Sequence, residues 1–448
     1  MSRQANVQLL ALASTLVILA SLLLAALAGC VSTPSPAPAS TTGQSTPTAA
    51  SMTAVATTPS PAPTPMEPRP SHISLTVWAP AQFSPLGTDA ASSLLQAQFE
   101  AFVIANQDIG VRQVVKAPYG ESGVVNLLLA TSYAAPSMLP DLAIVDAFQL
   151  EPLVRAGLAQ PLENLIAPDV TTDLFPFARA AGTFDDDLMA VQFETDIEHL
   201  IYYTEALEDP PATWADLFTG PVSYTFPAGG KGGLVNDSFL IQYASQGGQL
   251  TDGEGRPALE SSAVQRVLRM YDALRIWDVS PQRVLELEDL EDCWEAYTEG
   301  NVTVSHISSW RYLTSRPVLL DTAFAPLPTE TGAPATMSRG WAFVIVTDSP
   351  YRQEAAARLI EWVMMPENLA AWSQDTNHIP TRLSALRLAR WPSSYINFLE
   401  DQLASASYRP STPEFERIAR ALQVAVEGVL SGGSTPRQAT NQVMDSLQ

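Results

Sequence analysis

The chain has 448 residues, and its 47 aspartates and glutamates against 24 lysines and arginines give a formal net charge of −23. No basic stripe along the sequence can neutralise phosphates, which argues against binding to nucleic acid or anionic lipid headgroups and leaves neutral or cationic ligands. The hydrophobic content of 46% is ordinary for a globular protein.

The N-terminal segment reads as an export signal. Residues 7–28 are almost entirely apolar and follow the single positive charge of Arg3. The sequence Leu27-Ala28-Gly29-Cys30 resembles a bacterial lipobox, which predicts a lipoprotein signal peptide over 1–29 and lipidation of Cys30. An uncleaved membrane anchor is the alternative, because about 20 apolar residues can also span a bilayer. Both place the rest of the chain outside the cytoplasm, anchored to the bacterial cell membrane.

Residues 30–70 are rich in proline, serine and threonine, and we expect them to form a disordered tether. Beyond it, β-branched and apolar runs predict strands over 72–80, 111–118 and 141–146, with helical patterns between them. Strands that alternate with helices indicate an α/β protein with a parallel sheet.

The second part of the chain predicts further elements. Strand patterns cover 188–207, 302–308 and 339–346, and helical patterns cover 261–275, 285–297, 355–364 and the stretch from Phe415 to Val429. A short helix is expected from Thr213. Thr435 and Pro436 supply an N-cap and a first-turn proline for a last helix.

Signatures of catalysis are missing from the sequence. It contains no G-x-S-x-G elbow, no Walker A loop and no G-x-G-x-x-G, and its four histidines lack metal-ligand spacing. We therefore expect no enzyme, no cofactor and no metal. Cys293 is interpreted as a small buried thiol on an amphipathic helix, not as a nucleophile.

Two acidic clusters leave alternatives open. Asp185, Asp186 and Asp187 read as a polar turn before a strand, although they could also coordinate a cation. Glu194, Asp196 and Glu198 alternate along one face of an extended segment, where the carboxylate pair of a glycosidase could lie.

Seven segments in order resemble family 1 of the extracellular solute-binding proteins of ABC importers. They include ISLTVWAP (73–80), MLPDLAIVDAFQLEPLVRAGLAQPLENLI (138–166), PPATWADLF (210–218) and YTEGNVTVSHISSW (297–310). The similarity spans about 75–445. The sequence RGW at 339–341 departs from it, because many relatives have two glycines there.

This resemblance implies a two-lobed, type II periplasmic-binding-protein-like fold, with the ligand cleft between lobes joined by crossing hinge segments. Lobe 1 would comprise 71–185 plus 320–370, and lobe 2 would comprise 186–319 plus 371–448. The implied function is capture of a small solute, a sugar or oligosaccharide by family frequency, and its delivery by a monomer to the permease subunits of an ABC importer. A lipid-anchored carbohydrate-active hydrolase and a ligand sensor on the same fold are the alternatives.

The resemblance also points to candidate ligand contacts, at strand ends and at the crossings. Sugars bind to aromatic platforms that are surrounded by hydrogen-bonding groups. The candidates are Trp78, Asp146, Glu194, Asp196, Trp310, Arg339 and Trp341. Each has a structural alternative: packing for the tryptophans, helix capping for Asp146, and a solvent-facing position for Glu194.

Overall fold

The computed structural model describes residues 70–280, 282–410 and 412–448. The predicted signal peptide, Cys30 and residues 30–69 of the predicted tether lie outside the described residues. Among the helices of the described part, none is both long and apolar enough to cross a membrane.

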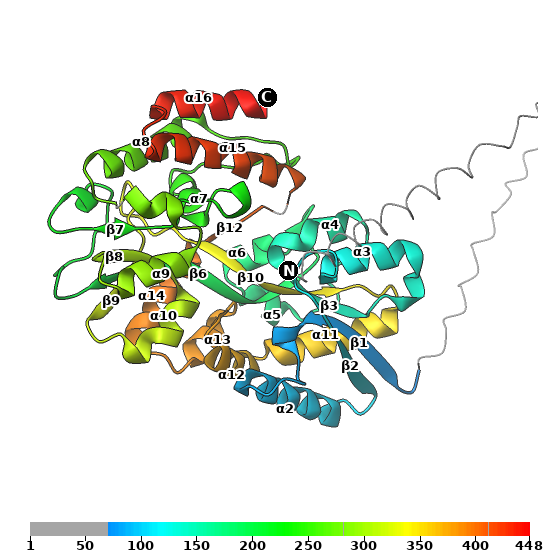
Figure 1. Cartoon of the computed structure of the whole chain (residues 1–448). Coiled ribbons are helices and arrows are strands. Elements are labelled where there is room, and N and C mark those ends of the chain that lie inside the picture. Colours follow the sequence, from blue (N-terminus) through cyan, green and yellow to red (C-terminus); the bar gives the residue numbers. More distant parts are fainter. Residues whose placement is uncertain (1–69, 281, 411) are drawn as a thin grey trace, which may run out of the picture. The chain divides into compact units, whose positions relative to one another are not determined.

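The described strands form one large mixed sheet and a small hairpin (Figure 1). The main path of the sheet runs β2-β1-β3-β10-β6-β8-β7; β9 and β11 also pair with β6, β12 pairs with β10, and β4 pairs with β5. The strands are β1 (Ile73–Pro80), β2 (Ile109–Lys116), β3 (Leu142–Asp146), β4 (Thr183–Phe184), β5 (Asp187–Leu188), β6 (Val191–Tyr203), β7 (Tyr224–Thr225), β8 (Val304–Ser308), β9 (Thr322–Ala325), β10 (Met337–Ile345), β11 (Ile379–Pro380) and β12 (Ser407–Tyr408).

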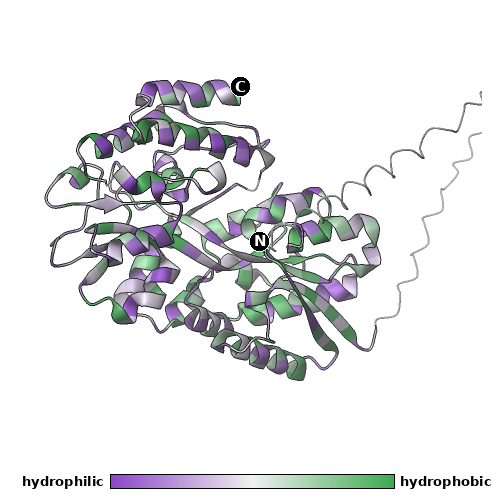
Figure 2. Cartoon of the chain, in the orientation of Figure 1, coloured by the Kyte–Doolittle hydropathy of each residue, from purple (hydrophilic) through white to green (hydrophobic). Residues whose placement is uncertain are grey.

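Helices connect and cover these strands. They are α2 (Ala90–Ala105), α3 (Val124–Ala134), α4 (Leu150–Arg155), α5 (Pro168–Thr172), α6 (Pro176–Ala181), α7 (Asp237–Ala244), α8 (Ser261–Ile276), α9 (Leu290–Thr298), α10 (Ser309–Ser315), α11 (Pro350–Met364), α12 (Pro366–Thr376), α13 (Leu383–Leu388), α14 (Ser393–Ala404), α15 (Pro413–Leu430) and α16 (Pro436–Leu447). Figure 2 shows hydrophobic green along the central strands and hydrophilic purple stretches along α15 and α16.

The first half of the core surrounds β1, β2 and β3. These strands are parallel, as the alternation of strands and helices predicted. Leu75 and Val77 pack with α2, α11 and α12 on one face, whereas Ala143 and Val145 pack with α3 and α4 on the other. Helices on both faces make the sheet a buried layer.

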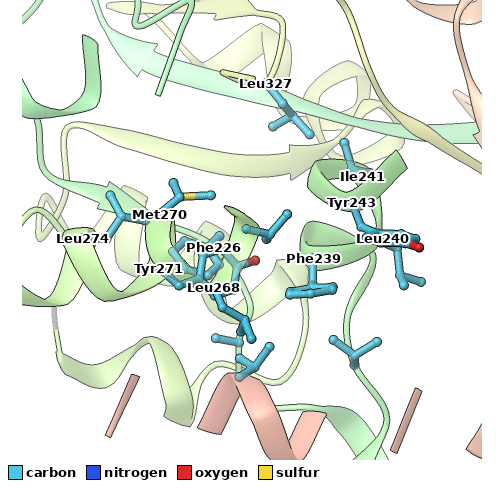
Figure 3. Packing of buried hydrophobic residues seen from close by; sticks show 14 of the residues in the cluster. Phe226, Phe239, Leu240, Ile241, Tyr243, Leu268, Met270, Tyr271, Leu274 and Leu327 are labelled. Carbon is cyan, nitrogen blue, oxygen red and sulfur yellow. The ribbon is translucent and has the colours of Figure 1, made fainter. Parts of the chain in front are cut away.

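The second half of the core surrounds the far ends of β6 and β10. One cluster gathers α7, α8, α15 and α16, with Phe239 against Tyr271 at a centroid distance of 5.9 Å (Figure 3). The other cluster joins α6, α9, α10 and α14 around the fully buried Tyr395. Each half therefore has its own apolar core.

Strands β6 and β10 belong to both halves. Val191 packs in the first half and Leu200 in the second, while Phe343 packs in the first half and Met337 in the second. The two strands are antiparallel neighbours, with Arg339 opposite Asp196. Because Leu327 still packs in the second half, the chain returns to the first half within β10, later than residue 320. The exact lobe boundaries stay a prediction.

Some expected elements differ in detail. The helix predicted over 285–297 begins at Leu290, because Asp289 and Asp292 form a capping box there. The short helix expected from Thr213 is a 3₁₀ turn over Asp216–Phe218. The final helix begins as predicted, with the Thr435 hydroxyl accepting from the backbone of Gln438.

The acidic run at 185–187 forms the turn of the β4–β5 hairpin. Asp185 and Asp186 both have positive φ, 49° and 70°, which is the backbone of a two-residue hairpin turn. A polar turn was the predicted structure. Among the described residues, no group of three or more His, Cys, Asp or Glu is arranged to hold a metal ion.

Candidate ligand-binding cleft

A cavity of about 320 Å³ lies where β6 and β10 pass from one half of the core to the other. This volume falls within the usual range of small-molecule sites. Its wall includes residues 146–149 after β3, residues 338–340 of β10, Tyr119, Gln192, Tyr408 and Arg409.

Asp146 ends β3 at the edge of this cavity. One carboxylate oxygen accepts from the Phe148 backbone N–H at 3.0 Å, and the other accepts from the Tyr119 hydroxyl at 2.6 Å. Burial raises the pKa of Asp146, and these two hydrogen bonds oppose the rise. Helix capping, the structural alternative for Asp146, is thus present, and the carboxylate still borders the cavity.

Two arginines of the cavity wall share one buried carboxylate. Asp237, the first residue of α7, is 0% exposed, and its two oxygens each accept an Nε–H at 2.5 Å, from Arg339 and from Arg409. Burial alone would raise the pKa of Asp237, but the two guanidinium groups outweigh it and lower that pKa below its ordinary value. Asp237 therefore fixes both arginines in place.

Arg339 also connects the cavity to a buried polar chain. Its Nη2 lies 3.5 Å from Glu198 Oε1, and Glu198 Oε2 lies 3.4 Å from His306 Nδ1. The Tyr224 hydroxyl bonds to the other nitrogen of His306. Asp237 and Glu198 thus balance the two arginines, and the lining as a whole has no excess of positive charge.

Gly340 lets β10 approach β6 closely beside the cavity. A Cβ atom on this residue would lie 1.9 Å from the Glu194 carbonyl oxygen and 2.5 Å from Gln192 Nε2, so no other side chain fits. Gln192 is buried, and its Oε1 has no hydrogen-bond partner among the described residues. It is an unused acceptor at the cavity wall.

Aromatic side chains complete the site. Tyr119 and Tyr408 are exposed at the cavity, and Phe148 of the wall packs against Phe415 of α15, with ring centroids 5.3 Å apart. Tyr408 also borders a second, more apolar cavity of about 430 Å³ between α6 and α7. The two cavities lie side by side along Tyr408.

Of the seven predicted contact residues, two line the cavity, one lies beside it and four make contacts elsewhere. Asp146 and Arg339 line the cavity. Trp341 lies beside it, opposite Asp146 in the β3–β10 register and 6.0 Å from the Tyr119 ring.

The other four predicted residues make internal contacts. Asp196 accepts from the Ser309 hydroxyl and the Trp310 backbone N–H, which caps α10.

Trp310 lies in a stacked orientation near His378, with ring centroids 6.3 Å apart, and the buried Glu194 accepts from the Trp372 indole at 2.6 Å. Trp78 lies on β1 under Lys116, outside this cavity.

Sequence reasoning missed Tyr119, Gln192, Tyr408, Arg409 and the buried Asp237. Asp237 is 102 residues from Arg339 and 172 residues from Arg409 in the chain, so no local spacing could reveal the cluster. The one available signal was the position of Asp237 at the start of a helix, four residues after the glycine-rich stretch that ends at Gly233.

The arrangement favours binding over chemistry. The lining offers donors on Arg339 and Arg409, acceptors on Asp146 and Gln192, and tyrosine faces. The predicted buried thiol is confirmed: Cys293 is fully buried, and burial raises its pKa well above the ordinary value, far from nucleophilic use.

Two core halves joined by crossing strands, with a polar and aromatic cavity at the crossing, define a two-lobed binding protein. Comparison with known proteins agrees with this class. The model of the family described as bacterial extracellular solute-binding protein matches residues 97–397, and the chain belongs to this family.

Among similar sequences is the maltotriose-binding protein of Pyrococcus abyssi, 21% identical over 303 residues. The alignment covers 65% of this chain and 66% of that protein. A probable amino-acid ABC transporter periplasmic-binding protein of Sinorhizobium fredii is 23% identical over 383 residues, which are 79% of this chain and 86% of that one.

A solved structure with the same fold is the cyclic alpha-maltosyl-1,6-maltose binding protein from Arthrobacter globiformis. Its TM-score is 0.69 at 19% identity, over 84% of this chain and 98% of that one. The predicted two-lobed, type II periplasmic-binding-protein fold is confirmed.

Proposed function

We propose that the protein captures a sugar or oligosaccharide in the cavity at the β6–β10 crossing and delivers it to an ABC importer. The observation that carries the proposal is the combination of exposed tyrosine faces with Asp146, Arg339 and Arg409 around one cavity. Sugars present flat apolar faces and a rim of hydroxyls, which need stacking surfaces together with donors and acceptors.

The charge balance of the cavity supports an uncharged solute. Asp237 pairs with both Arg339 and Arg409, Glu198 lies near Arg339, and Asp146 is a further carboxylate on the lining. A neutral polyhydroxyl ligand can use the arginine N–H groups and the aspartate oxygens without leaving a net charge uncompensated. The names of the similar proteins from Pyrococcus abyssi and Arthrobacter globiformis point to the same ligand class.

The proposed contact set is Asp146, Arg339 and Trp341 from the sequence prediction, with Tyr119 and Arg409 from the structure. The two halves of the core would be lobes 1 and 2, and ligand would shift an open–closed equilibrium by contacting both. A loaded monomer would then dock on permease subunits in the membrane. The chain would bind its solute without converting it, unlike the hydrolase alternative.

A melting-temperature screen tests this proposal with maltose, maltotriose, uronic acids, polyamines and amino acids. A ligand that binds only the native state must raise the melting temperature. Asp146→Asn, which removes a charged acceptor, should weaken the hit at least tenfold. Asp445→Asn makes the same charge change at an exposed site and should bind normally.

Three results would count against the proposal: no shift with any saccharide, a shift with amino acids alone, or an unchanged affinity in Asp146→Asn. Incubation with oligosaccharides distinguishes a binding protein from a hydrolase, because a binding protein leaves the oligosaccharides intact. Turnover would favour the hydrolase.

We also propose that Cys30 carries a lipid that anchors the protein on the outer side of the cell membrane. Metabolic labelling with a clickable fatty acid should mark the wild-type chain and not Cys30→Ser. A labelled Cys30→Ser chain would contradict lipidation at this position.

A further inference from the structure

A third and larger hollow lies away from the cleft, on one face of β1 and β2. It is a trough of about 920 Å³, and Ser74, Thr76 and Trp78 alternate along its floor. Asp141, just before β3, borders this trough, whereas Asp146 at the end of β3 borders the cleft. Five residues of strand separate the two sites by about 17 Å.

Three cations follow the floor of the trough in a row. Arg352 Nη1 donates to the Ser74 carbonyl at 3.1 Å, and Arg112 Nη2 donates to the Thr76 hydroxyl at 3.2 Å. The Lys116 ammonium lies 4.3 Å from the centre of the Trp78 ring. Because their partners are alternate residues of one strand, successive cations are anchored about 7 Å apart.

The row is positive in a strongly acidic protein. Within the described part of the chain, neither Arg112 nor Lys116 has a carboxylate at ion-pair distance, whereas Arg352 is paired with Asp141 at 2.9 Å. Asp348 is the other carboxylate on the lining. At physiological salt the Debye length is about 8 Å, so a ligand in the trough responds to these local charges more than to the net charge of −23.

We propose that the trough docks an extended, acidic peptide segment of a partner protein. In an extended peptide every second side chain points the same way, about 7 Å from the next, which matches the anchor spacing of Arg352, Arg112 and Lys116. Residues 347–349 of the lining lead into the 15-residue helix α11, and the start of a helix favours negative charge. This charge complementarity selects an acidic partner.

Fluorescence anisotropy with a labelled peptide tests the docking on the full chain in detergent. The peptide is Glu-Ser-Glu-Ser-Glu-Ser-Glu, and the comparison peptide has the same composition with its glutamates grouped together. Arg112→Gln combined with Lys116→Gln should weaken the alternating peptide at least tenfold and should leave the melting temperature unchanged. Added salt should weaken binding to the wild type.

Arg269→Gln combined with Arg437→Gln is the matched control. Both residues are exposed, both have no carboxylate at ion-pair distance in the described part of the chain, and the double variant loses the same charge. It should bind the alternating peptide like the wild type. Three results would overturn the proposal. The two double variants could lose affinity equally, or the grouped peptide could bind as well as the alternating one. The third is binding of inorganic polyphosphate without binding of the alternating peptide.

Discussion

Replacing Asp237 by asparagine should lower the free energy of unfolding by about 3 kcal/mol, because breaking a buried ion pair leaves uncompensated charge in the core. The carboxylate is fully buried and serves both Arg339 and Arg409. Arg409 is only 22% exposed, whereas Arg339 is 50% exposed and can turn towards water, which places the loss at the low end of the usual range. Denaturant unfolding of the wild type and the variant measures the difference.

The pH dependence of the same pair has a definite sign. The folded pKa of Asp237 is lowered from 3.8, so its contribution is complete above the unfolded pKa and is lost as pH falls through the folded value. Glu400→Gln breaks the exposed pair with Arg387 and should cost much less, because water and salt screen exposed charges. A loss in Asp237→Asn no larger than this control would show that the shared carboxylate is not structural.

Local patterns in the sequence predicted much of the fold. The apolar rhythm of α15 and the cap at Thr435 are contained within a few residues, and the structure confirms both. The start of α9 was missed because apolar residues continue upstream from Leu290, while the signal that decides is the capping box at Asp289. Where a capping hydrogen bond sets the start of a helix, the apolar periodicity of the sequence alone misplaces that start.

The cavity was harder to predict, because its residues come from distant strand ends. Asp146 and Arg339 were found since each lies at an expected strand or crossing. Trp78 was also expected there, but strand alternation turns it to the face where Lys116 covers it. The sequence predicts which residues share a face of a strand. Which helices or cavities contact that face depends on the packing of segments that are distant in the chain.

A second large effect is expected from a buried histidine in the second half. His199 on β6 is 0% exposed, and aromatic rings surround it, among them Tyr395 at 5.8 Å and Phe398 at 5.4 Å between centroids. Its Nδ1 lies 2.9 Å from the Leu200 carbonyl oxygen, so Nδ1–H donates and Nε2 accepts from the Tyr395 hydroxyl at 3.0 Å. Both ring nitrogens are therefore satisfied in the neutral form.

Burial lowers the pKa of His199 from 6.5 to about 4. Between these pH values the unfolded chain binds a proton that the folded chain excludes, so the free energy of unfolding should fall by about 3 kcal/mol as pH drops from 6.5 to 4. His199→Gln removes this titration. In unfolding curves measured between pH 6.5 and 4, the free energy of unfolding of the variant should therefore fall by about 3 kcal/mol less than that of the wild type. Tyr395→Phe removes one hydrogen bond but keeps the buried imidazole, so it should lower stability and preserve the slope. A His199→Gln slope equal to that of the wild type would mean that His199 is protonated in the folded protein, against its apolar surroundings.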